Sequence, residues 1–202
     1  MKKSILPLAV FTLSVSIPRL ALAHASIRGF GDFCNGVLHP VLVPSQVITS
    51  LAVGLLIGQQ SKDITLAARG FMFALLAGLL GAAFGLGFNR EVFLMLVAVG
   101  AGLLTAINTK QKNYLYWRFA VGAAAVLGLD SAPDGLTGKP LVFSLLGTFL
   151  GGSLGLFYVA RVWSKPREQW QHIGIRIVAS WTAASALLVM AMQLLEQKTG
   201  AS

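Results

Sequence analysis

Charged residues are scarce in this sequence. Only 11% of its 202 residues are Asp, Glu, Lys or Arg, whereas a soluble domain carries roughly 25%. A chain with so few charges cannot cover a globular surface with water-compatible side chains, and this excludes a soluble enzyme. Apolar residues make up 55% of the chain, and its mean hydropathy is +0.74. The composition therefore predicts a membrane protein.

Cysteine and acidic residues are also rare. Cys34 is the single cysteine, which excludes an intramolecular disulfide and a cysteine-cluster metal site. The 16 Lys and Arg outnumber the 7 Asp and Glu and give a net charge of +9. These cations are scattered between apolar runs and form no single stripe, so we expect no nucleic-acid binding. No catalytic triad order, phosphate loop or nucleotide fingerprint is evident, and we expect no enzymatic activity.

The amino terminus predicts a secretory signal peptide. Two lysines precede a short apolar stretch, and an Ala-x-Ala site ends at Ala23. Cleavage there assigns 1–23 to the signal peptide and 24–202 to a single mature domain that begins at His24. The alternative is an uncleaved first transmembrane helix, which the short apolar run and Pro18 disfavour.

The mature chain contains six apolar runs that are long enough to cross the ~30 Å hydrocarbon core as helices. Helices are the only open-chain way to satisfy backbone polar groups in lipid. The sequence therefore predicts an all-α, polytopic six-helix transmembrane bundle. The predicted spans are 37–58, 67–88, 91–108, 115–131, 140–161 and 172–195.

Lys and Arg near the span ends predict the orientation. With the mature amino terminus outside, more of these residues lie at inner ends than at outer ends, as the positive-inside rule requires. The inner set is Lys62, Arg69, Lys110, Lys112, Arg118, Arg161, Lys165, Arg167 and Arg176. The outer set is Arg28, Arg90, Lys139 and Lys198. We therefore expect an inner-membrane protein with both mature termini in the periplasm.

Glycines recur at a spacing of four residues in several spans. Gly147, Gly151 and Gly155 do so in the fifth span. This spacing lets helix backbones approach closely in lipid, where the hydrophobic drive between helices is lost. We interpret it as internal helix packing, with a dimer interface as the alternative. The oligomeric state stays open.

Side chains that bind metal ions gather near the outer end of the first span. His24, Asp32, Cys34 and His39 combine imidazole, carboxylate, thiolate and a free amino terminus, donors that suit nickel, cobalt, copper or zinc. The alternative is a solvated loop with an interfacial histidine and a small buried cysteine. Asp130, at the outer end of the fourth span, either ends its helix in a turn or offers a second carboxylate to the same vestibule.

Three short runs carry a family resemblance. They are Gly-Val-Leu-His-Pro at 36–40, Ala-Val-Gly-Leu-Leu-Ile-Gly-Gln at 52–59 and Gly-Leu-Asp-Ser at 128–131. Together with the signal peptide and six spans, they resemble the HupE/UreJ family of hydrogenase and urease accessory membrane proteins. The resemblance implies a secondary permease for nickel, or for cobalt in some branches, that supplies metalloenzyme assembly. The ion would be cargo, with no permanently bound cofactor.

The first span departs from the family pattern. That pattern is commonly His-Pro-x-x-Gly-x-Asp-His, whose histidines and aspartate are implicated in metal passage. His39 and Pro40 match it here. Val43 takes the glycine position, whereas Ser45 and Gln46 take the Asp-His positions. The resemblance therefore implies a variant branch in which neutral side chains line the path, and weak ligands are compatible with conduction.

Two hypotheses of different classes follow. The first is a transporter that moves a divalent metal ion inward across the lipid bilayer. The second is a non-transporting scaffold or assembly subunit that has lost the permease ligands and packs its glycine-rich faces against a partner, such as a metalloenzyme maturation system. A transporter for another solute is a third alternative.

Overall fold

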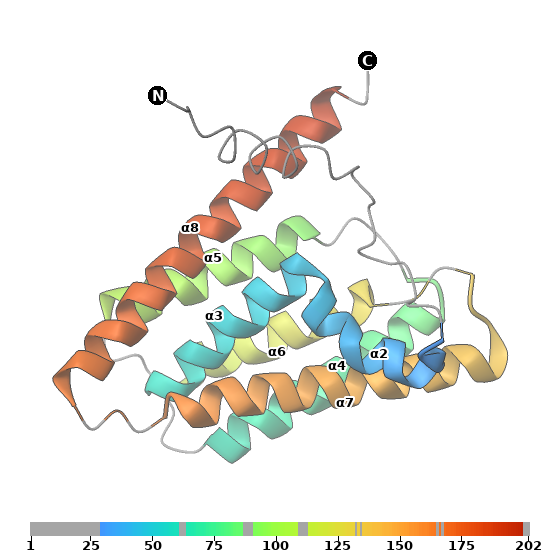
Figure 1. The fold of residues 1–202 in the computed structure, drawn as a ribbon, viewed down its shortest axis with the longest axis horizontal. Helices are drawn as coiled ribbons and strands as arrows, with labels where there is room; N and C mark the ends of the chain where they lie inside the picture. Colours follow the sequence, from blue (N-terminus) through green and yellow to red (C-terminus); the bar gives the residue numbers. More distant parts are fainter. Residues whose placement is uncertain are drawn as a thin grey trace, which may run out of the picture.

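We describe a computed structural model of the chain over residues 29–60, 64–86, 91–108, 113–131, 133, 135–164, 166 and 168–199. These ranges contain helices and no strand, as the sequence predicts. The helices are α2 (Gly31–Leu42), α3 (Pro44–Gln60), α4 (Ile64–Ala83), α5 (Glu91–Ile107), α6 (Asn113–Asp130), α7 (Gly138–Val162) and α8 (Gln169–Thr199) (Figure 1).

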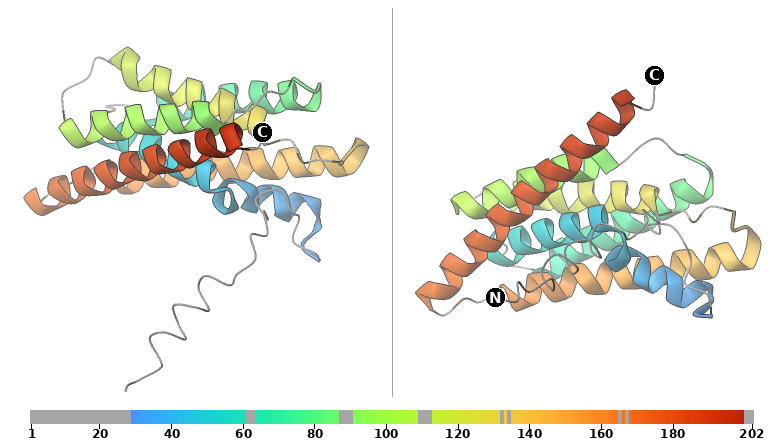
Figure 2. Two further views of the ribbon diagram at one scale, coloured as in Figure 1. Left: turned by 90° about the horizontal axis from the view of Figure 1, so that it is seen from above. Right: turned by 45° about the horizontal axis from the view of Figure 1, so that its top comes forward.

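Most of the helices run back and forth along one long direction, whereas α8 crosses them obliquely and ends away from the other helix ends (Figures 1 and 2). The ends of α3 and α7 and the start of α8 lie at the left of Figure 1, whereas α2 and α7 start at the right. α2 packs along α7, α4 along α6, and α5 along α8. The central helix is α3, which contacts α5, α6, α7 and α8.

The segment 37–58, predicted as one span, forms two helices in the structure. α2 and α3 are bent by 67° relative to each other, and Val43 between them has an extended backbone with φ −87° and ψ 112°. Pro44 explains the break, because its ring disfavours a helical conformation in the preceding residue and it has no backbone N–H. The bend brings side chains in the last turn of α2 closer to side chains in the first turn of α3 than a straight helix would.

Several helices have the length and composition of membrane spans. α4, α7 and the part of α8 up to Leu195 are long and apolar enough to cross a membrane. The bent α2–α3 pair is a fourth candidate if it counts as one broken span. α5 is apolar but has only 17 residues. The structure thus supports a membrane protein, and the count of six spans stays a prediction.

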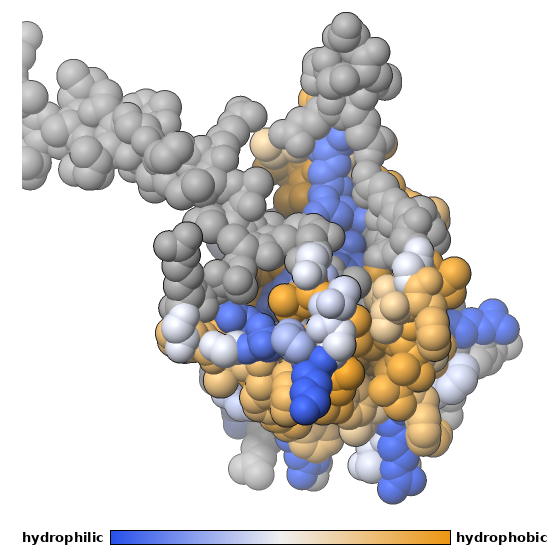
Figure 3. All heavy atoms as spheres, turned by 90° about the vertical axis from the view of Figure 1, so that its right-hand side faces the viewer, coloured by the Kyte–Doolittle hydropathy of each residue, from blue (hydrophilic) through white to orange (hydrophobic). Residues whose placement is uncertain are grey.

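The outside of the bundle is largely apolar. Phe73, Phe84 and Trp181 are at least 74% exposed. Viewed along the bundle, most of the described surface is hydrophobic, and hydrophilic residues form separate patches (Figure 3). Apolar surface of this extent is rare on soluble monomers, whereas lipid tails solvate it well.

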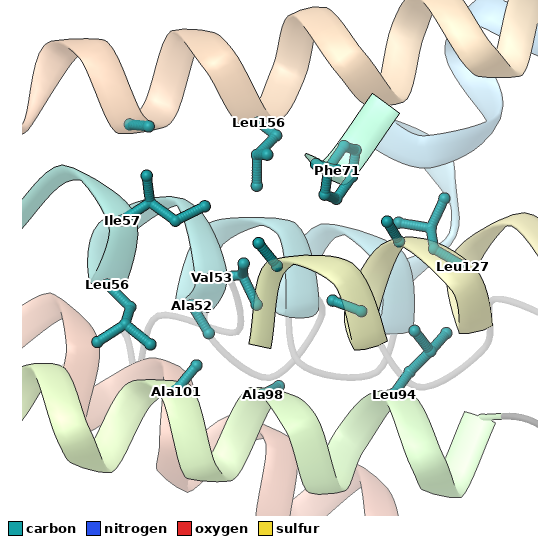
Figure 4. Close-up of a cluster of buried hydrophobic side chains, with 14 of the residues drawn as sticks. Ala52, Val53, Leu56, Ile57, Phe71, Leu94, Ala98, Ala101, Leu127 and Leu156 are labelled. Atoms are coloured by element: carbon teal, nitrogen blue, oxygen red, sulfur yellow. The ribbon is translucent and has the colours of Figure 1, made fainter. Parts of the chain in front are cut away.

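The core surrounds α3. Its Ala52, Val53 and Leu56 are fully buried, together with Ala98 and Ala101 of α5. Side chains from α4, α6 and α7 close the same cluster around α3 (Figure 4). The alanines have no bulk beyond Cβ, so α5 can lie close to α3.

The glycine spacing of α7 matches a close contact with α2. A Cβ added at Gly147 would overlap the carbonyl oxygen of Phe33, and one added at Gly151 would overlap that of Val37. Among the described residues, nothing lies within 4 Å of a Cβ added at Gly155. Two of the three predicted packing glycines therefore lie in a contact within the chain, and Gly155 lies outside it.

Candidate functional site

A cluster of polar side chains lies where α2 meets α3. At its centre is Gln46, which is 0% exposed. The Nε2 atom of Gln46 lies 3.1 Å from Oδ2 of Asp130, 3.2 Å from Nε2 of His39 and 3.2 Å from Oγ of Ser131. We call these four residues the Gln46 cluster.

Helix ends place each member of the cluster. His39 lies in the last turn of α2 and Gln46 in the first turn of α3. In a straight helix, residues seven apart are separated by about 10 Å along the axis, and the bend at Pro44 helps the two side chains to meet. Asp130 is the last residue of α6, and Ser131 follows it.

The hydrogen-bond chemistry of the cluster orients its groups. The carboxylate of Asp130 only accepts hydrogen bonds, so the Gln46 amide turns its NH₂ toward it. The Ser131 hydroxyl donates to the carbonyl of Leu127 at 2.6 Å, which leaves its lone pairs for Gln46. The NH₂ group has two hydrogens, which go to Asp130 and Ser131, and Nε2 of His39 contacts the same nitrogen at 3.2 Å. A neutral imidazole binds metal ions through the lone pair of a ring nitrogen.

Two buried oxygens in the first turn of α3 lack a hydrogen-bond partner among the described residues. They are Oε1 of Gln46 and Oγ of Ser45, whose side chain is 3% exposed. An unpaired buried polar group costs about 1–3 kcal/mol. A cation or a polar ligand would offset that cost, and Oε1 belongs to the same amide that contacts His39 and Asp130.

The other predicted metal ligands lie apart from the cluster. Asp32 and Cys34 precede His39 on α2 by seven and five residues, roughly 10 and 8 Å along the axis. Cys34 is exposed and Asp32 is half-buried. Within the described ranges, no group of three or more His, Cys, Asp or Glu could hold a metal ion. His24 lies outside the described residues.

Ser131 and Thr49 were not assigned a role from the sequence. Ser131 directly follows Asp130 in the Gly-Leu-Asp-Ser run, and that adjacency was an available signal. Thr49 lies one turn after Ser45, with its Oγ1 2.7 Å from the Ser45 carbonyl oxygen and 3.1 Å from that of Leu94 in α5. A contact with a distant helix leaves no local mark in the sequence.

The comparison with protein families identifies the chain. The model described as HupE / UreJ protein matches residues 12–189. The chain belongs to the HupE / UreJ family. The resemblance carried by the three short runs is thus confirmed. Comparisons with curated proteins and with solved structures gave no match.

Two of the runs that carry the resemblance meet in this HupE / UreJ chain. The first, 36–40, contributes His39, and the second, 128–131, contributes Asp130 and Ser131. All three side chains contact Gln46, which occupies the last position of the first-span motif. The family-like segments therefore form one site, although the chain carries them on different helices.

Beyond the cluster, α3 of this HupE / UreJ protein carries only apolar residues from Leu51 to Gly58. After Thr49, α3 directs Val53 and Leu56 into the core, each 0% exposed (Figure 4). Polar contacts return at the far end of α3, where Nε2 of Gln59 donates to the carbonyl of Thr105 at 3.2 Å. An apolar layer thus separates the Gln46 cluster from the opposite end of the bundle.

Proposed function

We propose that this HupE / UreJ protein is a secondary transporter of the inner membrane. It imports a divalent transition metal ion such as nickel or cobalt from the periplasm for metalloenzyme assembly. The observation that carries the proposal is the convergence of His39 and Asp130 on one atom of Gln46, although Gln46 and Asp130 are 84 residues apart in sequence. A neutral imidazole and a carboxylate at one position form a donor pair that suits these ions.

The residues around that pair suit passage better than storage. His39 receives the ion, and Asp130 compensates its charge. Ser45 and Gln46 contribute neutral oxygens, which bind such ions weakly, so a bound ion can leave again. His24, Asp32 and Cys34 precede the cluster on the amino-terminal side and collect ions there. The membrane potential supplies about 2.3 kcal/mol per charge per 100 mV for inward movement.

Passage through the far half of the bundle requires a rearrangement. Between Leu51 and Gly58, α3 offers no polar side chain to bind an ion on the way from the Gln46 cluster to Gln59. We propose that α3 moves relative to α5 when the ion proceeds, with the break at Val43 as the hinge. Hinges of this kind are short segments at element ends that absorb changes in φ and ψ.

Metal accumulation tests the proposal. A transport-deficient host producing the intact protein is compared with one producing His39→Ala at matched membrane abundance, and cell-associated nickel, cobalt, copper and zinc are measured by elemental analysis. We expect one metal to accumulate with the intact protein and to fall at least about tenfold with the variant. His172→Ala is the matched control, because His172 is exposed on α8, far along the chain from the cluster. Absence of accumulation by a well-inserted intact protein would overturn the permease function.

The apolar layer also favours a second function, a membrane scaffold for an assembly partner. A scaffold needs no path through its core, and its packing is the property that matters. Under this alternative, His39→Ala leaves the metal-dependent phenotype of the cell intact. Because α2 already covers Gly147 and Gly151, a bulky substitution at Gly155 is the one of the three that would abolish it by blocking a partner.

A further inference from the structure

The NH₂ group of Gln46 lies where a third ligand of a bound ion would lie. Its Nε2 lies 3.1 Å from Oδ2 of Asp130 and 3.2 Å from Nε2 of His39, separations like those between neighbouring ligand atoms of one ion. A transition metal ion binds an imidazole nitrogen and a carboxylate oxygen at about 2.0–2.2 Å. An ion held by His39 and Asp130 on the side of Gln46 would therefore contact this NH₂ group, which has hydrogens and no lone pair to offer it.

The other half of the same amide has the opposite property. Oε1 of Gln46 is buried and has no hydrogen-bond partner among the described residues. The amide nitrogen and oxygen have nearly the same size, and the last side-chain torsion of Gln is broad and roughly two-fold. A half-turn of the amide therefore exchanges a donor for an acceptor in the same volume.

We propose that Gln46 is a built-in competitor that limits the affinity of the cluster for its ion. Without an ion, the NH₂ group contacts His39 and donates to Asp130 and Ser131. When an ion enters, the amide turns, the two donated hydrogen bonds break, and Oε1 becomes a neutral third ligand. This inference rests on the proposed function and assigns the control of ion release to one residue.

The competition predicts the effect of changing Gln46. Hydrogen bonds that involve a charged group are stronger than neutral ones. Ion binding must break such a bond, the one that the Gln46 amide donates to Asp130. A carboxylate at position 46 shares a proton with Asp130 when no ion is present, and an entering cation displaces that proton and gains a charged oxygen ligand. A histidine there brings a nitrogen ligand without adding a buried charge. Both changes should tighten ion binding and slow ion release.

Cobalt binding to the purified protein tests this inference. The intact chain, Gln46→Glu and Gln46→His are titrated with Co²⁺ in detergent, and the visible absorption of the bound ion is followed. We expect at least about tenfold tighter binding by each variant, which corresponds to one hydrogen bond to a charged group. Gln171→Glu is the matched control. Oε1 of Gln171 accepts from the backbone N–H of Glu168, a role that a carboxylate keeps, and we expect unchanged affinity.

The outcomes separate this inference from the proposed function. We also expect cells to accumulate less cobalt per molecule of Gln46→Glu than per molecule of the intact chain. Accumulation thus falls while the affinity for Co²⁺ rises. Equal Co²⁺ affinity of the intact chain and both folded variants would overturn the competitor role, while accumulation that depends on His39 would leave the transport function standing. Failure of the intact chain and of both variants to bind Co²⁺, with helical content retained, would overturn both.

Discussion

At the scale of single residues, the first turn of α3 holds two of the five buried side-chain atoms that lack a hydrogen-bond partner among the described residues. Thr49, Thr105 and Thr148 each place a hydroxyl on the carbonyl four residues earlier, a common way to satisfy a hydroxyl inside a helix. Oγ of Ser45 and Oε1 of Gln46 have no partner among the described residues. An acceptor oxygen is thus left on the amide that contacts both His39 and Asp130.

A pair of Asp→Asn variants tests how the two carboxylates differ. Asp130 contacts Gln46, whereas Asp32 lies about two turns of α2 before His39. We expect Asp130→Asn to lower metal accumulation at least about tenfold, because the anionic ligand is lost, and Asp32→Asn to lower it about twofold or less. Elemental analysis of cells with equal protein abundance measures both. Equal losses from the two variants would show that Asp130 has no special place in the path.

At the scale of secondary structure, α2 and α7 pack backbone to backbone through their glycines. Gly36 of α2 faces the carbonyl of Ser144, and Gly147 and Gly151 of α7 face carbonyls of α2. Such contacts replace the hydrophobic drive that lipid removes. They also hold the last turn of α2, and with it His39, against the rest of the bundle.

Two substitutions four residues apart on α7 test this contact. Gly151→Ala places a methyl group against the backbone of α2 and should destabilise the protein by about 1–3 kcal/mol. Gly155→Ala is the matched control, because a Cβ there meets nothing within 4 Å among the described residues. The control should gain about 0.5–1 kcal/mol from lost chain entropy. Thermal unfolding in detergent measures the difference, and equal melting temperatures would refute the packing argument.

At the scale of the whole molecule, helix direction and charge agree with the proposed orientation. Arg69, Arg118 and Arg176 lie near the starts of α4, α6 and α8, and Arg161 lies near the end of α7. Lys139 lies at the opposite end of α7. The arginines therefore belong to the end of the bundle that is opposite to α2, as a periplasmic α2 requires.

The single cysteine allows a direct test of that orientation. Cys34 is exposed near the start of α2, and we expect a membrane-impermeant maleimide to label it in intact spheroplasts. In a Cys34→Ser background, Glu168→Cys just before α8 should be labelled only after the membrane is permeabilised. Glu168 is exposed, so access to the reagent depends on the membrane alone. The reverse labelling pattern would invert the proposed import direction.

Much of the fold followed from the sequence. Few charges and long apolar runs predicted a helical membrane protein, and the runs at 36–40 and 128–131 predicted the family. The helix bounds of the structure differ from the predicted spans by a few residues at most ends. The exception is 37–58, where Pro44 breaks the helix. A hydropathy average along the chain does not reveal such a break, because the residues on both sides of it are apolar.

The sequence by itself determined that the protein suits a membrane, because composition and the length of apolar runs are local properties of the chain. It also placed His39, Ser45, Gln46 and Asp130 among the candidates. Only the tertiary structure decided that His39 and Asp130 share the amide of Gln46, while Cys34 stays apart. That outcome depends on the bend at Pro44 and on the glycine contact between α2 and α7. Such contacts join residues that are distant in sequence, and no local pattern specifies them.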